Sequence, residues 1–266
     1  MMRAVLERLR QGKRSLDFPE QASHALVPRF RGRPQLSPAR CHEGCAECAD
    51  VCPTGAIRSS ADRIELDLGR CIFCSECQSA CPTGAVEFTQ DYRLAARSAQ
   101  DLVVDGREKE VRASLDRALR RLFGRSLKLR VVSAGGCNAC EADVNVLGTI
   151  GWDISRFGIE YAASPRHADG LLVTGPVTQN MRLALEETYA AVAEPRIVIA
   201  VGACAISGGL FADHPEALSG AASVVPVDLY IPGCPPHPLT ILDGLLRLLG
   251  KIAEDPVRFP ASQQAG

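Results

Sequence analysis

The chain has 266 residues, and 46% of them are hydrophobic, which is enough to bury the core of one large or two small domains. A formal net charge of −1 gives no general attraction for nucleic acid. The longest apolar candidate for a membrane segment, Ile197–Ile206, is far shorter than the roughly 20 residues that span a bilayer. Residues Met1–Leu16 are charged throughout and contain neither a secretory nor a twin-arginine signal, so we expect a soluble chain that stays in the cytoplasm.

The first 34 residues form a predominantly basic N-terminal arm. Within Met1–Arg14, Val5 and Leu9 recur at helical spacing among charged side chains, which predicts a short amphipathic helix. Such an arm could dock on an acidic partner or a membrane face, or it could be solvated. Because prolines interrupt regular structure beyond the helix, we expect the remainder to be a loosely ordered, solvated lead-in.

The next segment contains an internal duplication of a cysteine-rich sequence. The second copy reads Cys71-x2-Cys74-x2-Cys77-x3-Cys81-Pro, and the first reads Cys41-x3-Cys45-x2-Cys48-x3-Cys52-Pro, with one extra residue after Cys41. Both copies continue as Pro-Thr-Gly-Ala. The chain has twelve cysteines, and a cytoplasmic location would keep them reduced, so the clusters favour metal binding over disulfides.

The second copy has the spacing of bacterial two-cluster ferredoxins, in which three close thiolates hold one [4Fe-4S] cluster and the fourth reaches the other cluster. Residues 35–92 therefore resemble a ferredoxin-like domain. The resemblance implies a cluster I at site I (Cys41, Cys45, Cys48, Cys81) and a cluster II at site II (Cys71, Cys74, Cys77, Cys52). The extra residue makes Cys41 the least regular ligand, and His42 beside it is the alternative donor. Zinc, the alternative metal, more often takes two separated pairs of ligands.

Two short strands and a helical connector are expected around this domain. Arg63–Asp67 alternates polar and apolar residues, and Ala85–Phe88 is a second candidate strand. In residues 93–125, apolar side chains at helical spacing predict a connector that packs one domain on the next; they are Val111, Leu115, Leu119 and Leu122. The arginines on its other side have no interleaved aromatics, which favours a solvated or partner-facing stripe over a nucleic-acid surface.

Residues 126–252 alternate strands and helices, which predicts an α/β domain with a parallel sheet covered on both faces, followed by a tail at 253–266. The expected strands are Leu127–Ser133, Ile159–Ala162, Leu171–Thr174, Ile197–Val201 and Leu229–Ile231. The expected helices are Ala139–Leu147, Met181–Ala193 and Leu239–Leu249.

Four cysteines follow strands of this predicted sheet. Cys137, Cys140 and Cys204 come soon after two strands, and Cys234 lies three residues after a third. The carboxyl ends of parallel strands meet at one edge of a sheet, which is where ligands bind in open α/β folds. The sequence therefore predicts one four-thiolate site, site III.

The motifs around these cysteines resemble the small subunit shared by complex I-related, membrane-bound nickel–iron hydrogenases and the B-type component of NADH:quinone oxidoreductase (the 20 kDa-like family). They are Gly136-Cys137-x2-Cys140-Glu141, Gly175-Pro176-Val177-Thr178, Gly202-x-Cys204-Ala205-x2-Gly208-Gly209 and Gly233-Cys234-Pro235-Pro236. The resemblance implies a flavodoxin-like α/β domain whose site III holds a proximal [4Fe-4S] cluster facing a large subunit. Cys137 and Cys140 are separated, as in hydrogenases, whereas quinone-reducing subunits have two adjacent cysteines there. The chain resembles formate hydrogenlyase-type small subunits in this half, and its ferredoxin half resembles the two-cluster subunit that partners them as a separate chain. The chain therefore looks like a fusion of the two.

This resemblance implies an electron-transfer subunit with three [4Fe-4S] clusters and no catalytic residue of its own. The implied partners are a hydrogenase or complex I-like large subunit, other subunits of a membrane-bound complex, and an electron-donor dehydrogenase or ferredoxin. Through them the chain would be attached peripherally to the cytoplasmic membrane. The alternatives are a subunit of a quinone-reducing, complex I-like assembly and an iron–sulfur redox sensor.

Two polar residues near site III are candidates for proton transfer or for tuning the cluster potential. Glu141 follows Cys140 directly, and His237 lies three residues beyond Cys234. The alternatives are a carboxylate at the start of a helix for Glu141 and a histidine at a subunit interface for His237.

Overall fold

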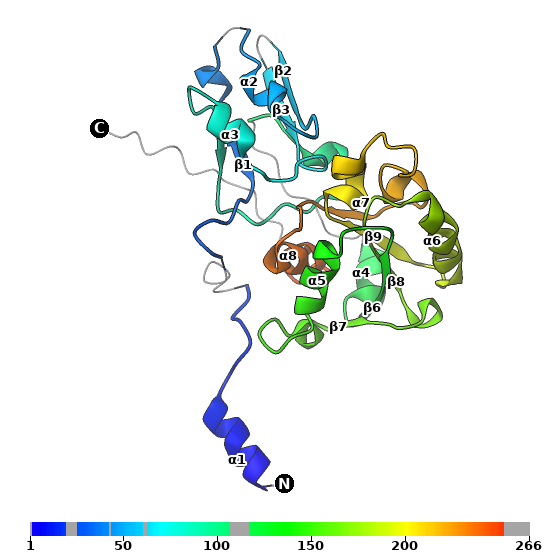
Figure 1. Ribbon diagram of the computed structural model, residues 1–266. Coiled ribbons are helices and arrows are strands. Elements are labelled where there is room, and N and C mark those ends of the chain that lie inside the picture. Colours follow the sequence, from blue (N-terminus) through cyan, green and yellow to red (C-terminus); the bar gives the residue numbers. More distant parts are fainter. Residues whose placement is uncertain (1, 20–25, 43, 61–62, 107–116, 253–266) are drawn as a thin grey trace.

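The computed structural model describes residues 2–19, 26–42, 44–60, 63–106 and 117–252. A small cysteine-rich unit and a larger α/β domain lie at opposite ends of the folded body, and the first helix projects away from the α/β end (Figure 1). None of the described helices has the length and apolar character needed to cross a bilayer. The predicted fold class, a ferredoxin-like unit followed by an α/β domain with a parallel sheet, is confirmed.

The predicted first helix is present as α1 (Met2–Gln11), but the expectation of a loosely ordered lead-in beyond it is wrong. Leu16 N donates to Gly151 O (2.8 Å), and the guanidinium of Arg156 donates to Ser15 Oγ and to Leu16 O (2.9 and 2.6 Å). Phe18 is buried against the ring of Tyr92. These long-range contacts, which short-range sequence patterns do not reveal, attach the arm to the α/β domain.

The arm then passes to the cysteine-rich unit as an edge strand. Gly32 N donates to Thr89 O (2.7 Å), and β1 (Pro34–Leu36) pairs antiparallel with β4 (Val86–Phe88). Arg33 is almost fully buried, and its Nη2 donates to Arg93 O (2.9 Å). The arm therefore connects both halves of the molecule.

In its described residues, the cysteine-rich unit contains two small antiparallel sheets and two short helices. The first sheet is β1–β4, and the second has the order β2-β3-β5. Both predicted strands are present, and the alternating pattern of β3 buries Ile64 and Leu66. The remaining elements are η2 (Pro38–Arg40), α2 (Glu47–Asp50), β2 (Ile57–Ser60), β3 (Arg63–Asp67), α3 (Glu76–Ala80), η3 (Gln100–Leu102) and β5 (Val103–Val104).

The helical connector predicted for residues 93–125 is wrong over its first part. Ala96 exchanges two backbone hydrogen bonds with Tyr230 of the α/β domain (3.0 and 2.8 Å), and β5 pairs with β3. Extended chain is favoured here because it pairs with strands from both halves, and such pairing outweighs local helix propensity. Helix α4 (Arg117–Phe123) contains Leu119 and Leu122, whereas Val111 and Leu115 lie outside the described residues.

The α/β domain has one parallel sheet in the order β10-β9-β8-β6-β7. Numbered along the domain, this is the flavodoxin-like order 2-1-3-4-5, whose topological switch point lies between β6 and β8. All five predicted strands are present: β6 (Leu127–Ser133), β7 (Ile159–Tyr161), β8 (Gly170–Thr174), β9 (Ile197–Val201) and β10 (Leu229–Ile231).

Helices cover both faces of this sheet, as predicted. On one face, Leu172 and Ile199 pack in one core with residues of α5 and α8; on the other, Leu171 and Val198 share a core with α6 and α7. Every residue of α8 is buried. The helices are α5 (Ala139–Val146), α6 (Gln179–Ala191), α7 (Ala203–Ser207) and α8 (Pro238–Leu248), with 3-10 turns η4 (Ile154–Phe157), η5 (Pro165–His167), η6 (Gly209–Phe211) and η7 (Ala221–Ser223).

Candidate metal centres

Site III forms at the carboxyl ends of three strands. Cys137 and Cys140 lie between β6 and the first turn of α5, Cys204 lies in the first turn of α7 after β9, and Cys234 follows β10. Burial raises the pKa of Cys140 to about 12, and the neighbouring charges add to this shift; they are those of Cys204, Glu141, Cys234 and Cys137. The structure therefore brings together the four thiols that the sequence predicted for this site.

Glycine backbone packs directly on these sulfurs. A Cβ atom added to Gly202 would lie 2.5 Å from Cys140 Sγ, and one added to Gly209 would lie 3.1 Å from Cys204 Sγ. Gly202 N donates to Ile231 O and Ala203 N donates to Gly233 O, both at 2.8 Å, so the loops after β9 and β10 are joined. Glycine backbone therefore lies against the sulfurs of Cys140 and Cys204.

Glu141 is buried beside site III at the switch point of the sheet. Its Oε1 accepts hydrogen bonds from Ser133 Oγ (2.5 Å) and from Thr174 Oγ1 (2.6 Å), at the ends of β6 and β8. Burial raises the pKa of Glu141, but these hydrogen bonds outweigh it and hold the pKa below its usual value. The carboxylate is therefore ionised and ties the first turn of α5 to two strands, while a role in proton transfer stays a prediction.

His237 caps the N-terminus of α8. Its Nδ1 accepts a hydrogen bond from Leu239 N (3.1 Å), so Nδ1 is unprotonated and the proton of the neutral ring is on Nε2. The ring lies edge-on to Phe30 and Trp152, with centroids 5.3 and 5.9 Å away. Burial lowers the pKa of His237, which favours the neutral ring. The hydrogen bond and the two ring contacts hold the histidine, three residues after Cys234, in place.

Site II gathers around an internal cavity of the ferredoxin-like unit. Cys52, Cys71, Cys74 and Cys77 line this small cavity of about 10 Å³ together with Leu66 and Phe88. Burial raises the pKa of Cys71 to about 12. The charges of the other three thiols add to this shift, and a hydrogen bond from Phe73 N opposes it. The fourth ligand predicted from the other copy, Cys52, does lie with the three from this copy.

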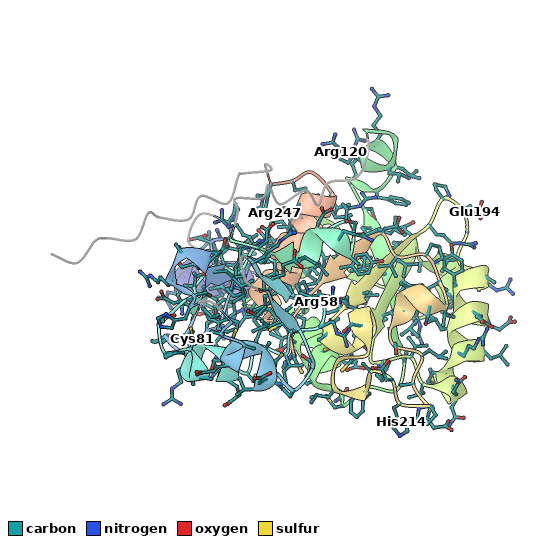
Figure 2. All side chains as sticks on the ribbon, turned by 90° about the horizontal axis from the view of Figure 1, so that it is seen from above. Arg58, Cys81, Arg120, Glu194, His214 and Arg247 are labelled. Atoms are coloured by element: carbon teal, nitrogen blue, oxygen red, sulfur yellow. The ribbon has the colours of Figure 1, made fainter. Side chains whose placement is uncertain are left out.

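Site I lies at the outer end of the same unit, where Figure 2 labels Cys81. Burial raises the pKa of Cys41, and the charges of Cys81 and Cys45 add to this shift. Burial likewise raises the pKa of Cys48, with contributions from the charges of Cys81, Cys41 and Cys45. Cys41 therefore lies with the other three thiols despite the extra residue in its loop. That loop is closed by a hydrogen bond from Cys45 N to His42 O (3.1 Å).

The two copies hold their final cysteines in the same way. Ala56 N donates to Cys52 Sγ and Ala85 N donates to Cys81 Sγ, both at 3.2 Å. The hydroxyls of Thr54 and Thr83 lie 3.8 and 3.6 Å from the same sulfurs. Burial opposes ionisation of both thiols, but these backbone and hydroxyl donors together hold their pKa values below the usual range.

Sequence reasoning missed two arginines that brace these loops. Arg70 Nε donates to Thr54 O, and Arg40 Nη1 donates to Gly84 O, both at 3.3 Å. Each arginine directly precedes the first cysteine of one copy and reaches the Pro-Thr-Gly turn of the other. The signal that could have revealed them is their repetition before Cys41 and Cys71.

Site II is the ferredoxin-like site nearer to site III. Ser207 Oγ of α7 donates to Gly69 O (2.8 Å), two residues before Cys71, and a Cβ at Gly69 would touch Ile206. Phe73, between Cys71 and Cys74, lines a second cavity of about 310 Å³ together with Cys234. Arg31 Nη1 donates to Phe73 O (3.0 Å), so the arm also braces the loop of site II.

The donor set fits iron–sulfur clusters. All twelve cysteines are free thiols, and burial with the neighbouring thiols raises the pKa of Cys71 and of Cys140. Cysteine binds metal as a thiolate, so loading of these sites would release protons. Within the described residues no three His, Cys, Asp or Glu side chains lie close enough to hold a single metal ion. Backbone N–H groups point at Cys52, Cys71 and Cys81 Sγ, and such hydrogen bonds help to set cluster potentials.

Comparisons with known protein families identify both the cysteine-rich unit and the α/β domain. Residues 33–99 match the 4Fe-4S dicluster domain, and residues 137–248 match the family described as NADH ubiquinone oxidoreductase, 20 Kd subunit. The chain is 40% identical over 134 residues to the probable membrane-bound hydrogenase subunit mbhJ of Pyrococcus furiosus, covering 50% of this chain and 80% of that protein.

Two further relatives come from different complexes. Formate hydrogenlyase subunit 7 of Escherichia coli is 40% identical over 161 residues, covering 60% of this chain and 63% of that protein. The B-type component of the NADH-quinone oxidoreductase of Saccharopolyspora erythraea is 44% identical over 126 residues, covering 47% of this chain and 57% of that protein. The chain therefore belongs to the 20 Kd-subunit family of NADH ubiquinone oxidoreductase and carries a 4Fe-4S dicluster domain in the same polypeptide.

Proposed function

We propose that this chain relays electrons through three [4Fe-4S] clusters to or from the large-subunit active site of a membrane-associated, formate hydrogenlyase-like nickel–iron hydrogenase. The observation that supports the proposal is that Phe73, which lies between two thiols of site II, lines the same cavity as Cys234 of site III. The similarity to formate hydrogenlyase subunit 7 and to a membrane-bound hydrogenase subunit supports the kind of complex.

The proposed order of the relay is site I, site II, site III. Sites I and II are joined through α2, because Cys48 of site I lies in that helix and Cys52 of site II follows it. On its other side, the loop of site II contacts α7 through Gly69. Site I is on the outer end of the ferredoxin-like unit, which suits contact with an external donor such as a dehydrogenase or a ferredoxin. At the other end, Cys137 and Cys234 are exposed, which suits coverage by a large subunit.

The chain's own residues would hold the clusters and set their potentials. When bound, the clusters supply one-electron carriers. Thr54, Thr83 and the backbone N–H groups at Ala56 and Ala85 stabilise negative charge on the sulfurs that they contact. The ionised Glu141 holds α5 in place, so that Cys137 and Cys140 keep one geometry.

The first experiment counts iron and resolves the centres. Anaerobically prepared protein should contain about twelve irons per chain, and an electron paramagnetic resonance (EPR) redox titration should resolve three centres. Cys45→Ser, Cys74→Ser and Cys204→Ser should each remove about four irons and a different one of the three signals. Zinc-loaded protein without brown absorption, or the loss of the same signal in two variants, would contradict the assignment.

The second experiment separates the hydrogenase from a quinone-reducing assembly, which the likeness to the NADH-quinone oxidoreductase component favours. Affinity purification from the native host should recover a large subunit that contains nickel and produces hydrogen from reduced carrier. Recovery of a nickel-free large subunit with quinone reductase activity would replace the hydrogenase proposal. A stable monomer or homodimer without partners would instead favour a redox sensor.

A further inference from the structure

Helix α1 presents an apolar face that is open to solvent in the described part of the chain. Val5, Leu6 and Leu9 lie on one side of the helix, and they are 56%, 55% and 75% exposed. Leucine and valine side chains with this exposure are costly in water when they form a continuous stripe. The stripe is therefore a candidate docking surface.

The remaining surface of α1 is strongly basic. Arg3, Arg8 and Arg10 share the helix with a single acid, Glu7, which pairs with Arg10 (3.5 Å). Lys13 and Arg14 follow directly, and Lys13 pairs with Asp17. An apolar stripe flanked by several arginines and lysines is typical of helices that lie in the interface of an anionic bilayer.

The position of α1 suits this role. The backbone is fixed at Leu16, which donates to Gly151 O on the α/β domain, so α1 projects from the end opposite the ferredoxin-like unit (Figure 1). Ile150, next to that anchor, is 68% exposed, so a second apolar side chain faces solvent at the same end of the molecule. A ten-residue helix is about 15 Å long, which is half of the thickness of a bilayer core, so it can lie on a membrane but cannot span it.

We propose that α1, with Lys13 and Arg14, lies on an anionic lipid surface and attaches this chain to the membrane directly, in addition to any attachment through partner subunits. The apolar stripe would enter the boundary between headgroups and acyl chains, while the arginines contact lipid phosphates. One short helix gives weak, reversible binding, so this contact would orient the α/β end toward the membrane rather than hold the complex alone. The inference is independent of the electron-transfer proposal.

The test is flotation of the full-length, cluster-loaded chain with vesicles. Vesicles of equal parts phosphatidylglycerol and phosphatidylcholine should bind the protein, pure phosphatidylcholine vesicles should bind it weakly, and high salt should release it. Replacing both leucines (Leu6→Glu with Leu9→Glu) should reduce the partition coefficient by at least roughly tenfold. Arg8→Gln with Arg10→Gln should remove the preference for phosphatidylglycerol.

The matched control is Leu183→Glu, which makes the same change at a leucine of α6 that is 65% exposed. It should bind vesicles as the unchanged protein does, and all variants should keep the same iron content. Equal vesicle binding by the Leu6 and Leu9 variant would overturn the proposal. So would a concentration-dependent dimer in sedimentation that this variant abolishes, because the stripe would then cover a second copy of the chain.

Discussion

Gly202 offers the sharpest test of how site III is built. Its backbone has φ +92° and ψ 154°, a region that is essentially restricted to glycine and that costs a side-chain-bearing residue about 1–3 kcal/mol. An added Cβ would lie 2.5 Å from Cys140 Sγ, whereas ordinary contacts begin at 3.4 Å. In Gly202→Ala the sulfur must therefore move by about 0.9 Å, several times the tolerance of about 0.2 Å for a metal–ligand distance.

We therefore expect Gly202→Ala to lose about four of about twelve irons and the EPR signal of site III, while the signals of sites I and II remain as internal standards. The matched control is Gly151→Ala, because a Cβ at Gly151 meets nothing within 4 Å and its φ is ordinary. Iron and sulfide analysis with low-temperature EPR would measure both variants. Full iron content and an unchanged site III signal in Gly202→Ala would refute the close packing of backbone on Cys140.

Three further predictions concern the sulfur contacts, the buried ion pair and the arm. Thr83→Val removes a hydroxyl 3.6 Å from Cys81 Sγ, so one ferredoxin-like centre should lose about 20–60 mV of midpoint potential without losing iron; an unchanged EPR redox titration would contradict this. Burial raises the pKa of Asp243 from 3.8 to about 6, although the ion pair with Arg247 opposes this shift. Because the folded protein binds the proton more tightly than the unfolded chain, the group stabilises the fold below about pH 4, and this stabilisation is lost as the pH rises through about 6. Asp243→Asn should flatten this part of the pH profile of thermal unfolding, by up to ~3 kcal/mol, and an identical profile would exclude the effect. Arg156→Ala removes the bonds to Ser15 and Leu16, so trypsin should cut after Arg14 roughly tenfold faster, whereas Arg182→Ala on exposed α6 should not change the rate.

The α/β domain was predictable because its strands are uninterrupted apolar runs that parallel sheets bury on both faces. Ile197–Val201 and Leu229–Ile231 were expected from such runs, and both are fully buried strands. The spacing of Cys71, Cys74 and Cys77 likewise fixes a local loop, which is why site II could be anticipated. The thiol that completes it, Cys52, was assigned only through the resemblance to two-cluster ferredoxins.

Apart from the convergence of the four site III thiols, the sequence did not predict which distant segments contact each other. Ala96 is extended because it pairs with Tyr230, a partner that no local pattern around residue 96 reveals. Burial of Glu141 depends on the ends of β6 and β8 being neighbours, which follows only from the strand order. The helical spacing in 93–125 is real at Leu119 and Leu122, but pairing with two sheets determines the conformation of the first part of that connector.

The anchored arm constrains how a nascent chain reaches its native state. Ser15 and Leu16 leave the ribosome before the cysteine-rich repeats, yet the groups that bind them, Gly151 and Arg156, emerge only after the first strand of the α/β domain. Domains generally fold in the order of synthesis, so the cysteine-rich unit, including the pairing of β1 with β4, would form first, and residues 15–18 would dock last, once the α/β domain is complete.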